Sequence, residues 1–363
     1  MTKIARPIAV MVAGLALVAA ACSSNSSTSS PGASGSGTAL SGELNGAGSS
    51  AQQAAQQAWI ASFTSGQPNL TINYDPNGSG AGVEQFTSGA VSFAGSDAYL
   101  SGDSLTAANS QCGGEDKVVE LPVYISPIAI AFNVPNVTSL NMTPDVVAKI
   151  FKGDITNWND QAIASLNSGV TLPDLAISPV HRSDDSGTTF NFTDYLSQAA
   201  KSTWTYPASE TWPLKGGEAA EGTSGVVSAI KSGSGTIGYA DASQVGNLGT
   251  TKVQVNGQFV GISAEAAAAI VDQATQVPGR GPYDFAYNLD RTPSQTAYPV
   301  VLLSYEIACT TYSDASTAAN VKGYLNYIIS EPAQQLAAQN AGSAPISDKI
   351  RTQAQTGVDA IGS

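Results

Sequence analysis

Residues 176–196 read AISPVHRSDDSGTTFNFTDYL. The first six residues predict a strand, and the apolar positions after the Ser-Gly-Thr-Thr turn predict a helix that continues through Leu196. The start of such a helix presents unpaired backbone N–H groups and the positive end of the helix dipole. This stretch therefore predicts a strand–turn–helix unit of an α/β fold that is able to bind an anion.

Two more segments rich in glycine and serine precede predicted helices, at 46–50 and at 78–82. Alternating strands and helices predict doubly wound sheets, which bind ligands beyond the carboxyl ends of their strands. The expected strands lie at 70–74, 91–93, 176–181, 236–239 and 298–307. The expected helices lie at 49–63, 83–88, 143–151 and 224–231, and a further helix follows the loop at 182–189 and continues through 196. A buried strand pair or crossover is expected at 118–134.

Any one of these glycine-rich loops is usually only a capped helix start. Three of them in one chain, with Asp97 and Arg182 in similar loops, indicate one shared anion site. The planar guanidinium of Arg182 matches an oxyanion, although a surface ion pair with Asp184 or Asp185 is the alternative. Asp97 can face an anion only if the anion carries a proton, and its alternative role is to cap the following turn.

Several motifs together resemble the PstS phosphate-binding family. They are GAGSS at 46–50, NY at 73–74 with GS at 78–79, VSFAGSD at 91–97, HRSDDSGTT at 181–189, IFKGDITNW at 150–158 and GTIGY at 235–239. The resemblance covers most of residues 43–345, and it implies two α/β lobes of the periplasmic-binding-protein type (type II), joined by two crossing strands and closing over a dehydrated phosphate. The segment GSAPI at 342–346 departs from the family, whose members usually carry an aromatic residue and Leu-Pro there.

The resemblance also implies the roles of individual residues. Asp97 would accept a hydrogen bond from the ligand, and Asp184 would pair with Arg182 and orient it. The phosphate donors would be Ser50, the Ala51 backbone N–H, Ser79, Arg182, Ser186, Gly187 and Thr188. The chain would be a monomeric receptor that delivers phosphate to the membrane subunits of an ABC importer. A non-catalytic surface module of the same fold, or a receptor for another tetrahedral oxyanion, is the alternative.

The N-terminus has a charged start, an apolar run over 8–21 and then Cys22, which predicts a signal peptide over 1–21. LVAAAC at 17–22 resembles a lipobox, which implies that Cys22 is lipidated. The polar residues over 22–42 would be a flexible tether that holds an extracytoplasmic protein on the cell membrane. The alternative is an ordinary signal peptide that is cut nearby.

The remaining chain is longer than one core usually supports, so two lobes are expected. One would comprise 43–131 with 305–363 and the other 132–304, with hinges near Phe132 and Leu303. Cys112 and Cys309 form an even pair in an oxidising compartment, which favours a disulfide over two buried thiols.

Composition argues against other classes of protein. The net charge of −13 comes without a basic stripe, which disfavours nucleic acid as a partner. His181 is the single histidine, no metal-ligand spacing is recognisable, and no Walker loop is present. We therefore expect no catalysis, no metal and no cofactor, and we interpret His181 as a strand-end residue.

Overall fold

The computed structural model describes residues 39–294 and 297–362. The predicted signal peptide, Cys22 and all of the predicted tether before residue 39 lie outside the described residues. None of the helices in the described part of the chain is both long and apolar enough to cross a membrane.

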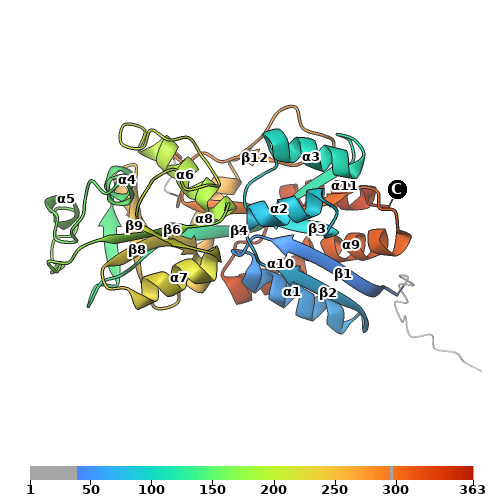
Figure 1. Ribbon diagram of the computed structural model, residues 1–363, viewed down its shortest axis with the longest axis horizontal. Coiled ribbons are helices and arrows are strands. Elements are labelled where there is room, and N and C mark those ends of the chain that lie inside the picture. The colour runs from blue at the N-terminus through green and yellow to red at the C-terminus, as the bar shows by residue number, and fades with distance from the viewer. Residues whose placement is uncertain (1–38, 295–296, 363) are drawn as a thin grey trace, which may run out of the picture. The chain divides into compact units, whose positions relative to one another are not determined.

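The first group of elements surrounds a mainly parallel set of strands (Figure 1). Strand β1 pairs in parallel with β2 and β3, whereas β13 pairs antiparallel with β3 and β4. The strands are β1 (Ser41–Gly48), β2 (Asn69–Asp75), β3 (Phe93–Ser96) and β13 (Val301–Cys309). The helices are α1 (Gln53–Ser65), α2 (Ser79–Thr87), α3 (Gly102–Cys112), α9 (Ala315–Ile328), α10 (Glu331–Ala341) and α11 (Asp348–Ala360).

A second group of elements continues the same sheet around β8, which pairs in parallel with β6, and β6 in turn with β7. Its strands are β5 (Ser139–Met142), β6 (Ser178–Arg182), β7 (Glu218–Ala220), β8 (Thr236–Asp241), β9 (Gly249–Val255) and β10 (Gln258–Val260), with β11 (Thr275–Gln276) and β12 (Tyr287–Asn288) as a separate pair. Its helices are α4 (Pro144–Lys152), α5 (Gln161–Ala164), α6 (Gly187–Ala199), α7 (Gly222–Ser232), α8 (Ala264–Val271) and the 3-10 turn η1 (Ala242–Gln244). The parallel βα units predicted from the sequence are confirmed in both groups.

Strand β4 (Val118–Asn133) connects the two groups. It is one continuous 16-residue strand that passes from one group to the other, so the strand pair expected over 118–134 is wrong and its alternative, a crossover region, is confirmed. The run contains no glycine, and the register against β13 shifts between Pro122 and Tyr124, beside a proline that has no N–H to donate to the ladder. Between Pro127 and Ile128 the partner of β4 changes from β13 to β8.

Helix α2 begins at Ser79, so the prediction of a helix that starts at residue 83 is wrong. The glycines of 78–82 form its first turn because the helix packs directly on β1. A Cβ atom on Gly82 would lie only 2.3 Å from the Cα of Gly48. The segment 46–48 belongs to β1, and the strand expected at 91–93 is β3, which begins at Phe93.

Other local predictions are confirmed. Thr143 caps α4 by accepting a hydrogen bond from the backbone N–H of Val146 at 3.2 Å, and Gly153 ends the helix with a positive φ of 81°. Cys112 and Cys309 form a disulfide that joins the end of α3 to the end of β13. In the divergent segment 342–346, Ala344 forms an antiparallel bridge with Ile125, and Ile346 is buried.

Candidate functional site

Loops from both groups of elements meet beyond the carboxyl ends of β1, β3 and β6. A Cβ atom on Gly78 would lie 3.5 Å from Nη2 of Arg182, and one on Gly222 would lie 3.7 Å from Oγ of Ser50. The backbone N–H of Gly80 donates to the carbonyl of Asp185 at 3.1 Å. The N-termini of α2 and α7 are thus brought to the same place as the loop before α6.

Ser50 and Ala51 lie between β1 and α1, and both are buried. The hydroxyl of Ser50 lies 3.0 Å from the hydroxyl of Thr223 and accepts from the backbone N–H of Thr223 at 2.9 Å. The N–H of Ala51 donates to Oγ of Ser49 at 3.1 Å. Ser49 therefore already engages the N–H that the resemblance implied as a ligand donor.

Ser79 begins α2, and its hydroxyl oxygen accepts from the backbone N–H of Asp97 at 3.2 Å. Because the oxygen accepts this bond, the hydroxyl hydrogen remains available as a donor. The first residue of α2 thus supports the loop that follows β3.

Asp97 follows β3, and its side chain is 3% exposed. Its Oδ1 accepts from the hydroxyls of Ser49 at 2.5 Å and of Ser304, and its Oδ2 accepts from Oγ1 of Thr188 at 3.0 Å. Burial raises the pKa of Asp97, while these hydrogen bonds and the charge of Arg182 oppose the rise.

The turn after β3 is capped by Ser96 and not by Asp97, so the alternative role of Asp97 as a turn cap is wrong. The backbone N–H of Ala98 donates to Oγ of Ser96 at 3.2 Å, and that hydroxyl donates to the carbonyl of Ala98 at 2.6 Å. The carboxylate of Asp97 is directed at side-chain donors instead, which is the arrangement expected of a site residue.

Arg182 ends β6, and its side chain is 2% exposed, so the alternative of a surface ion pair is wrong. Its Nε donates to Oδ1 of Asp184 at 2.8 Å, and its Nη2 is paired with Oδ2. The N–H of Gly222 also donates to Asp184, at 3.1 Å. Among the described residues, Nη1 of Arg182 has no hydrogen-bond partner, so this nitrogen can donate to a ligand.

Ser186, Gly187 and Thr188 form the start of α6. Ser186 caps the helix by accepting from the N–H of Thr189 at 3.2 Å. A Cβ atom on Gly187 would lie 2.6 Å from the backbone nitrogen of Ala98, so only glycine lets the helix approach the loop of Asp97 this closely.

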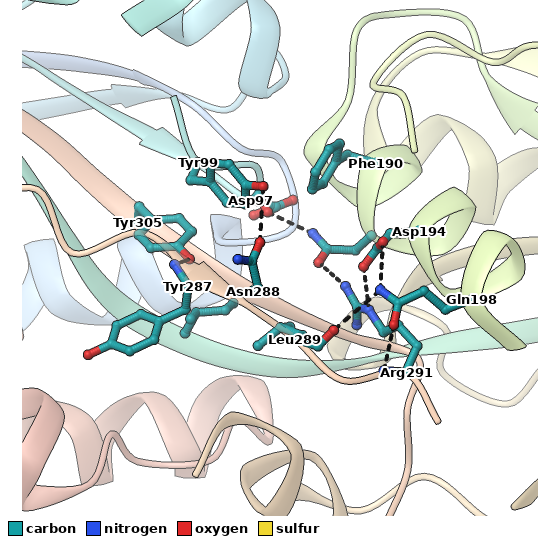
Figure 2. Close-up of a pocket in the computed structure, with 12 residues that line it drawn as sticks. Asp97, Tyr99, Phe190, Asp194, Gln198, Tyr287, Asn288, Leu289, Arg291 and Tyr305 are labelled. Carbon is teal, nitrogen blue, oxygen red and sulfur yellow. Dashed lines mark hydrogen bonds and ion pairs between the residues drawn. The ribbon is translucent and has the colours of Figure 1, made fainter. Parts of the chain in front are cut away.

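A cavity of about 60 Å³ adjoins Asp97, and Tyr99, Phe190 and Arg291 are among the residues that line it (Figure 2). Arg291 is buried; its Nε donates to Asp194 at 2.8 Å and its Nη2 to Oδ1 of Asn191 at 2.6 Å. Its Nη1 donates to the carbonyls of Pro299 and Val301 at 3.1 and 2.7 Å.

The amide of Asn191 connects Arg291 to the backbone of the site. Its Nδ2 donates to the carbonyl of Asp97 at 2.6 Å and to that of Gly187 at 2.9 Å. Arg291 therefore links the segment that enters β13 to α6 and, through Asn191, to the backbone of Asp97.

All of the predicted phosphate-site residues thus lie in or beside one cluster, together with several residues that the sequence did not predict. No role at the site was predicted for five of these residues, which are Ser49, Asn191, Thr223, Arg291 and Ser304. The run GTSG at 222–225 has the same glycine and serine signal before a helix and could have identified Thr223. His181 lies at the end of β6 and stacks on Trp212, with ring centroids 5.2 Å apart, as expected of a strand-end residue.

Comparison with known proteins shows the family of this chain. A model of the PBP superfamily domain matches residues 28–332. Phosphate-binding protein PstS 3 of Mycobacterium leprae is 36% identical over 323 residues, which cover 88% of this chain and 86% of that protein. Phosphate-binding protein PstS 2 of Mycobacterium tuberculosis is 35% identical over 367 residues, covering 98% of this chain and 97% of that protein.

Solved structures agree in fold. A phosphate-binding protein from Stenotrophomonas maltophilia superposes with a TM-score of 0.67 at 21% identity, covering 87% of this chain and 94% of the other. A putative phosphate ABC transporter substrate-binding protein from Clostridium perfringens gives 0.60 at 19% identity, covering 84% and 100%. The periplasmic-binding-protein-like fold expected from the sequence is therefore confirmed, and the chain belongs to the PstS family of the PBP superfamily.

Proposed function

We propose that this chain is an extracytoplasmic receptor that captures inorganic phosphate and delivers it to an ABC importer. The observation that carries the proposal is the convergence of Arg182, Asp97 and the starts of α2 and α6 on one buried place. Relatives that are 35–36% identical across most of the chain are named phosphate-binding proteins, which supports the same ligand.

The proposed ligand contacts are those of a dry oxyanion site. The donors are Ser50, the Ala51 N–H, Ser79, Arg182, Ser186, Gly187 and Thr188, and the acceptor is Asp97. The Ala51 N–H would exchange its bond to Ser49 for one to the ligand, and Thr188, whose hydroxyl donates to Asp97, would donate through its backbone N–H. Each charge-assisted hydrogen bond contributes about 1.5–3 kcal/mol. An ionised Asp97 accepts the P–OH hydrogen of hydrogen phosphate, whereas fully ionised sulfate has no such hydrogen and would leave buried acceptors facing each other.

Capture would use two lobes, 43–131 with 305–363 and 132–304, that close on the ligand. The change of strand partner between Pro127 and Ile128 supports a hinge in β4 a few residues before Phe132. Contacts between Asp97 and Thr188, and between Ser50 and Thr223, are the bonds that closure would form.

Calorimetric titration with phosphate, sulfate, arsenate and molybdate tests the proposal. We expect phosphate to bind and sulfate to bind much more weakly. Absence of heat with phosphate, in protein that is folded and freed of endogenous ligand, would refute phosphate as the ligand.

We also propose that the protein is a monomer held on the cell membrane by a lipid on Cys22, with the membrane subunits of the importer as partners, and that it has no catalytic activity. Replacing Cys22 with Ala should release the protein from the membrane fraction, whereas Cys112→Ala should not. Retention of the Cys22 variant on membranes would exclude the lipid anchor.

A further inference from the structure

A buried chain of hydrogen bonds leads from Asp97 to a second carboxyl group, that of Glu306 on β13. Oγ of Ser304 donates to Oδ1 of Asp97 and accepts from Nε2 of Gln52 at 2.7 Å. Oε1 of Gln52 accepts from Nε2 of Gln56 at 2.9 Å. The same nitrogen of Gln56 donates to Oε1 of Glu306 at 2.6 Å. All five side chains are buried.

This chain has a direction, because a side-chain amide donates from its nitrogen and accepts at its oxygen. Ser304 has one hydroxyl hydrogen, and its oxygen accepts from Gln52. That hydrogen is directed to Asp97, the nearer acceptor, because the carbonyl of Ser96 lies 3.4 Å away. If Gln56 were turned end for end, two amide oxygens would meet unless Gln52 turned with it, and Gln52 would then also lose its hydrogen bond to the carbonyl of Tyr305, at 3.3 Å. Ser304 would then donate to Oε1 of Gln52, and Asp97 would lose the hydrogen bond.

Glu306 and Tyr324 hold Gln56 in the observed orientation. The hydroxyl of Tyr324 donates to Oε1 of Gln56 at 2.7 Å, and Glu306 accepts from Nε2. A turned Gln56 would place its oxygen against Oε1 of Glu306, and two buried acceptors in contact are unfavourable.

The surroundings of Glu306 allow one of its carboxyl oxygens to accept a hydrogen bond from Gln56. Its Oε2 has no hydrogen-bond partner among the described residues. The titratable groups that face it are Tyr74 of β2, Tyr324 of α9 and Asp97. Burial raises the pKa of Glu306 well above its usual range, and a hydrogen on Oε2 leaves Oε1 free to accept from Gln56.

We propose that Glu306 is a positioning residue: through Gln56, Gln52 and Ser304 it ensures that a hydroxyl donates to Asp97, so that Asp97 remains an acceptor toward the ligand. The consequence for ligand selectivity rests on the proposed function. The predicted change in the titration of Asp97 does not depend on the proposed function.

Loss of the donor from Ser304 would favour the protonated form of Asp97, because hydrogen bonds to a carboxylate stabilise its ionised form. A protonated Asp97 donates, so it would tolerate sulfate and no longer select for the hydrogen of phosphate. The preference for phosphate over sulfate should then fall, and fall further at lower pH.

The matched variants are Glu306→Met and Glu306→Gln, which keep the length of the side chain. Gln retains an oxygen that accepts from Gln56, whereas Met does not. In ligand-free protein, carboxyl ¹³C NMR should show Asp97 titrating at a higher pH in Glu306→Met and in Ser304→Ala than in wild type. Glu306→Gln should titrate as wild type does.

The double variant Glu306→Met with Ser304→Ala should titrate like Ser304→Ala alone, because Glu306 acts through Ser304. In competition binding, Glu306→Met and Ser304→Ala should each lower the phosphate-to-sulfate preference about tenfold. This is the size expected for losing one hydrogen bond to a charged group. Tyr324→Phe removes only the hydroxyl that holds Gln56. It should raise the pH at which Asp97 titrates and lower the phosphate-to-sulfate preference, each by less than Glu306→Met does. This variant keeps the test available if Glu306→Met does not fold.

An Asp97 titration that is unchanged in Glu306→Met, or in Tyr324→Phe if that is the variant that folds, would overturn the inference, as would additive effects of Glu306→Met and Ser304→Ala. If wild type fails to bind phosphate while the NMR shifts appear as expected, the proposed function fails and the positioning role stands.

Discussion

Oγ1 of Thr188 at the start of α6 donates to Oδ2 of Asp97 across 91 positions of the chain, at 3.0 Å. This bond joins the loop after β3 to the helix after β6, so the acceptor of the site is held from both groups of elements. Together with Ser49 and Ser304, Thr188 supplies three hydroxyl donors to one buried carboxylate. Asp97 is thereby kept as an acceptor in a place where the other proposed ligand groups donate.

Asp97→Asn should reduce the discrimination between phosphate and sulfate. The new amide keeps the size of the side chain and can donate to sulfate, while the hydrogen of phosphate loses its charged acceptor. Losing that match costs about 1–3 kcal/mol or more, so sulfate should gain on phosphate by at least tenfold in competition binding. Asp103→Asn, at the start of α3, is the control and should leave the ratio unchanged. An unaltered ratio in Asp97→Asn would show that selectivity arises elsewhere.

Arg182→Lys should weaken phosphate binding by about 1.5–4 kcal/mol, because lysine keeps the charge but lacks the planar fork that pairs with Asp184 and leaves Nη1 for the ligand. Arg280→Lys is a suitable control, since Arg280 is a buried arginine paired with Glu120 and Asp284 outside the site. That variant should lower stability without a comparable loss of affinity. Wild-type affinity in Arg182→Lys would assign Arg182 a structural role only.

Removing the disulfide with Cys112→Ser and Cys309→Ser together should destabilise the fold. A bridge over 197 positions constrains the unfolded chain by about 4–5 kcal/mol in the chain-entropy account. Denaturant unfolding of the double variant, compared with oxidised and reduced wild type, measures the effect. Non-reducing peptide mapping should find the two cysteines linked, and two alkylatable thiols in the native protein would contradict the pairing.

Arg291→Met should lower both stability and phosphate affinity. It leaves Asp194 and Asn191 without their buried cationic partner, and breaking such a pair costs about 3–5 kcal/mol. Arg351→Met is the control, because Arg351 pairs with Asp348 at the surface and exposed pairs contribute about 0–1 kcal/mol. If Arg291→Met unfolds at the same denaturant concentration as the control, the network around Asn191 does not support the site.

The free energy of unfolding should fall as pH rises between about 4.5 and 7 through the contribution of Glu210. Burial raises the pKa of Glu210 from its ordinary 4.5 to about 7, so the folded state holds a proton that the unfolded state releases in this range. Stability then decreases with pH by at most about 1.4 kcal/mol per unit for this one group. Glu210→Gln should flatten that part of the profile, while the exposed Glu84→Gln should not. An identical slope in Glu210→Gln and wild type would exclude Glu210 as its source.

The sequence by itself determined the βα units, and its resemblance to the PstS family supplied all of the proposed ligand residues. Helix caps, glycine turns and strand alternation are local features, and anion-binding groups at helix starts lie within a few residues of those signals. Thr143, Gly153 and the segment 181–189 could therefore be interpreted without the fold. Residues 118–133 could not, because a continuous apolar run fits one strand or two until its partners are known.

Only the tertiary structure decided which distant groups support the site. Ser304 reaches Asp97 across 207 positions, Thr223 reaches Ser50 across 173, and Arg291 reaches Asn191 across 100. A serine on a buried strand or an arginine in a loop has no local pattern that marks its partner. The role of Ser304 follows from the packing of β13 against β3 and β4. Thr223 reaches Ser50 from the start of α7, and Arg291 reaches Asn191 of α6 from a loop before β13.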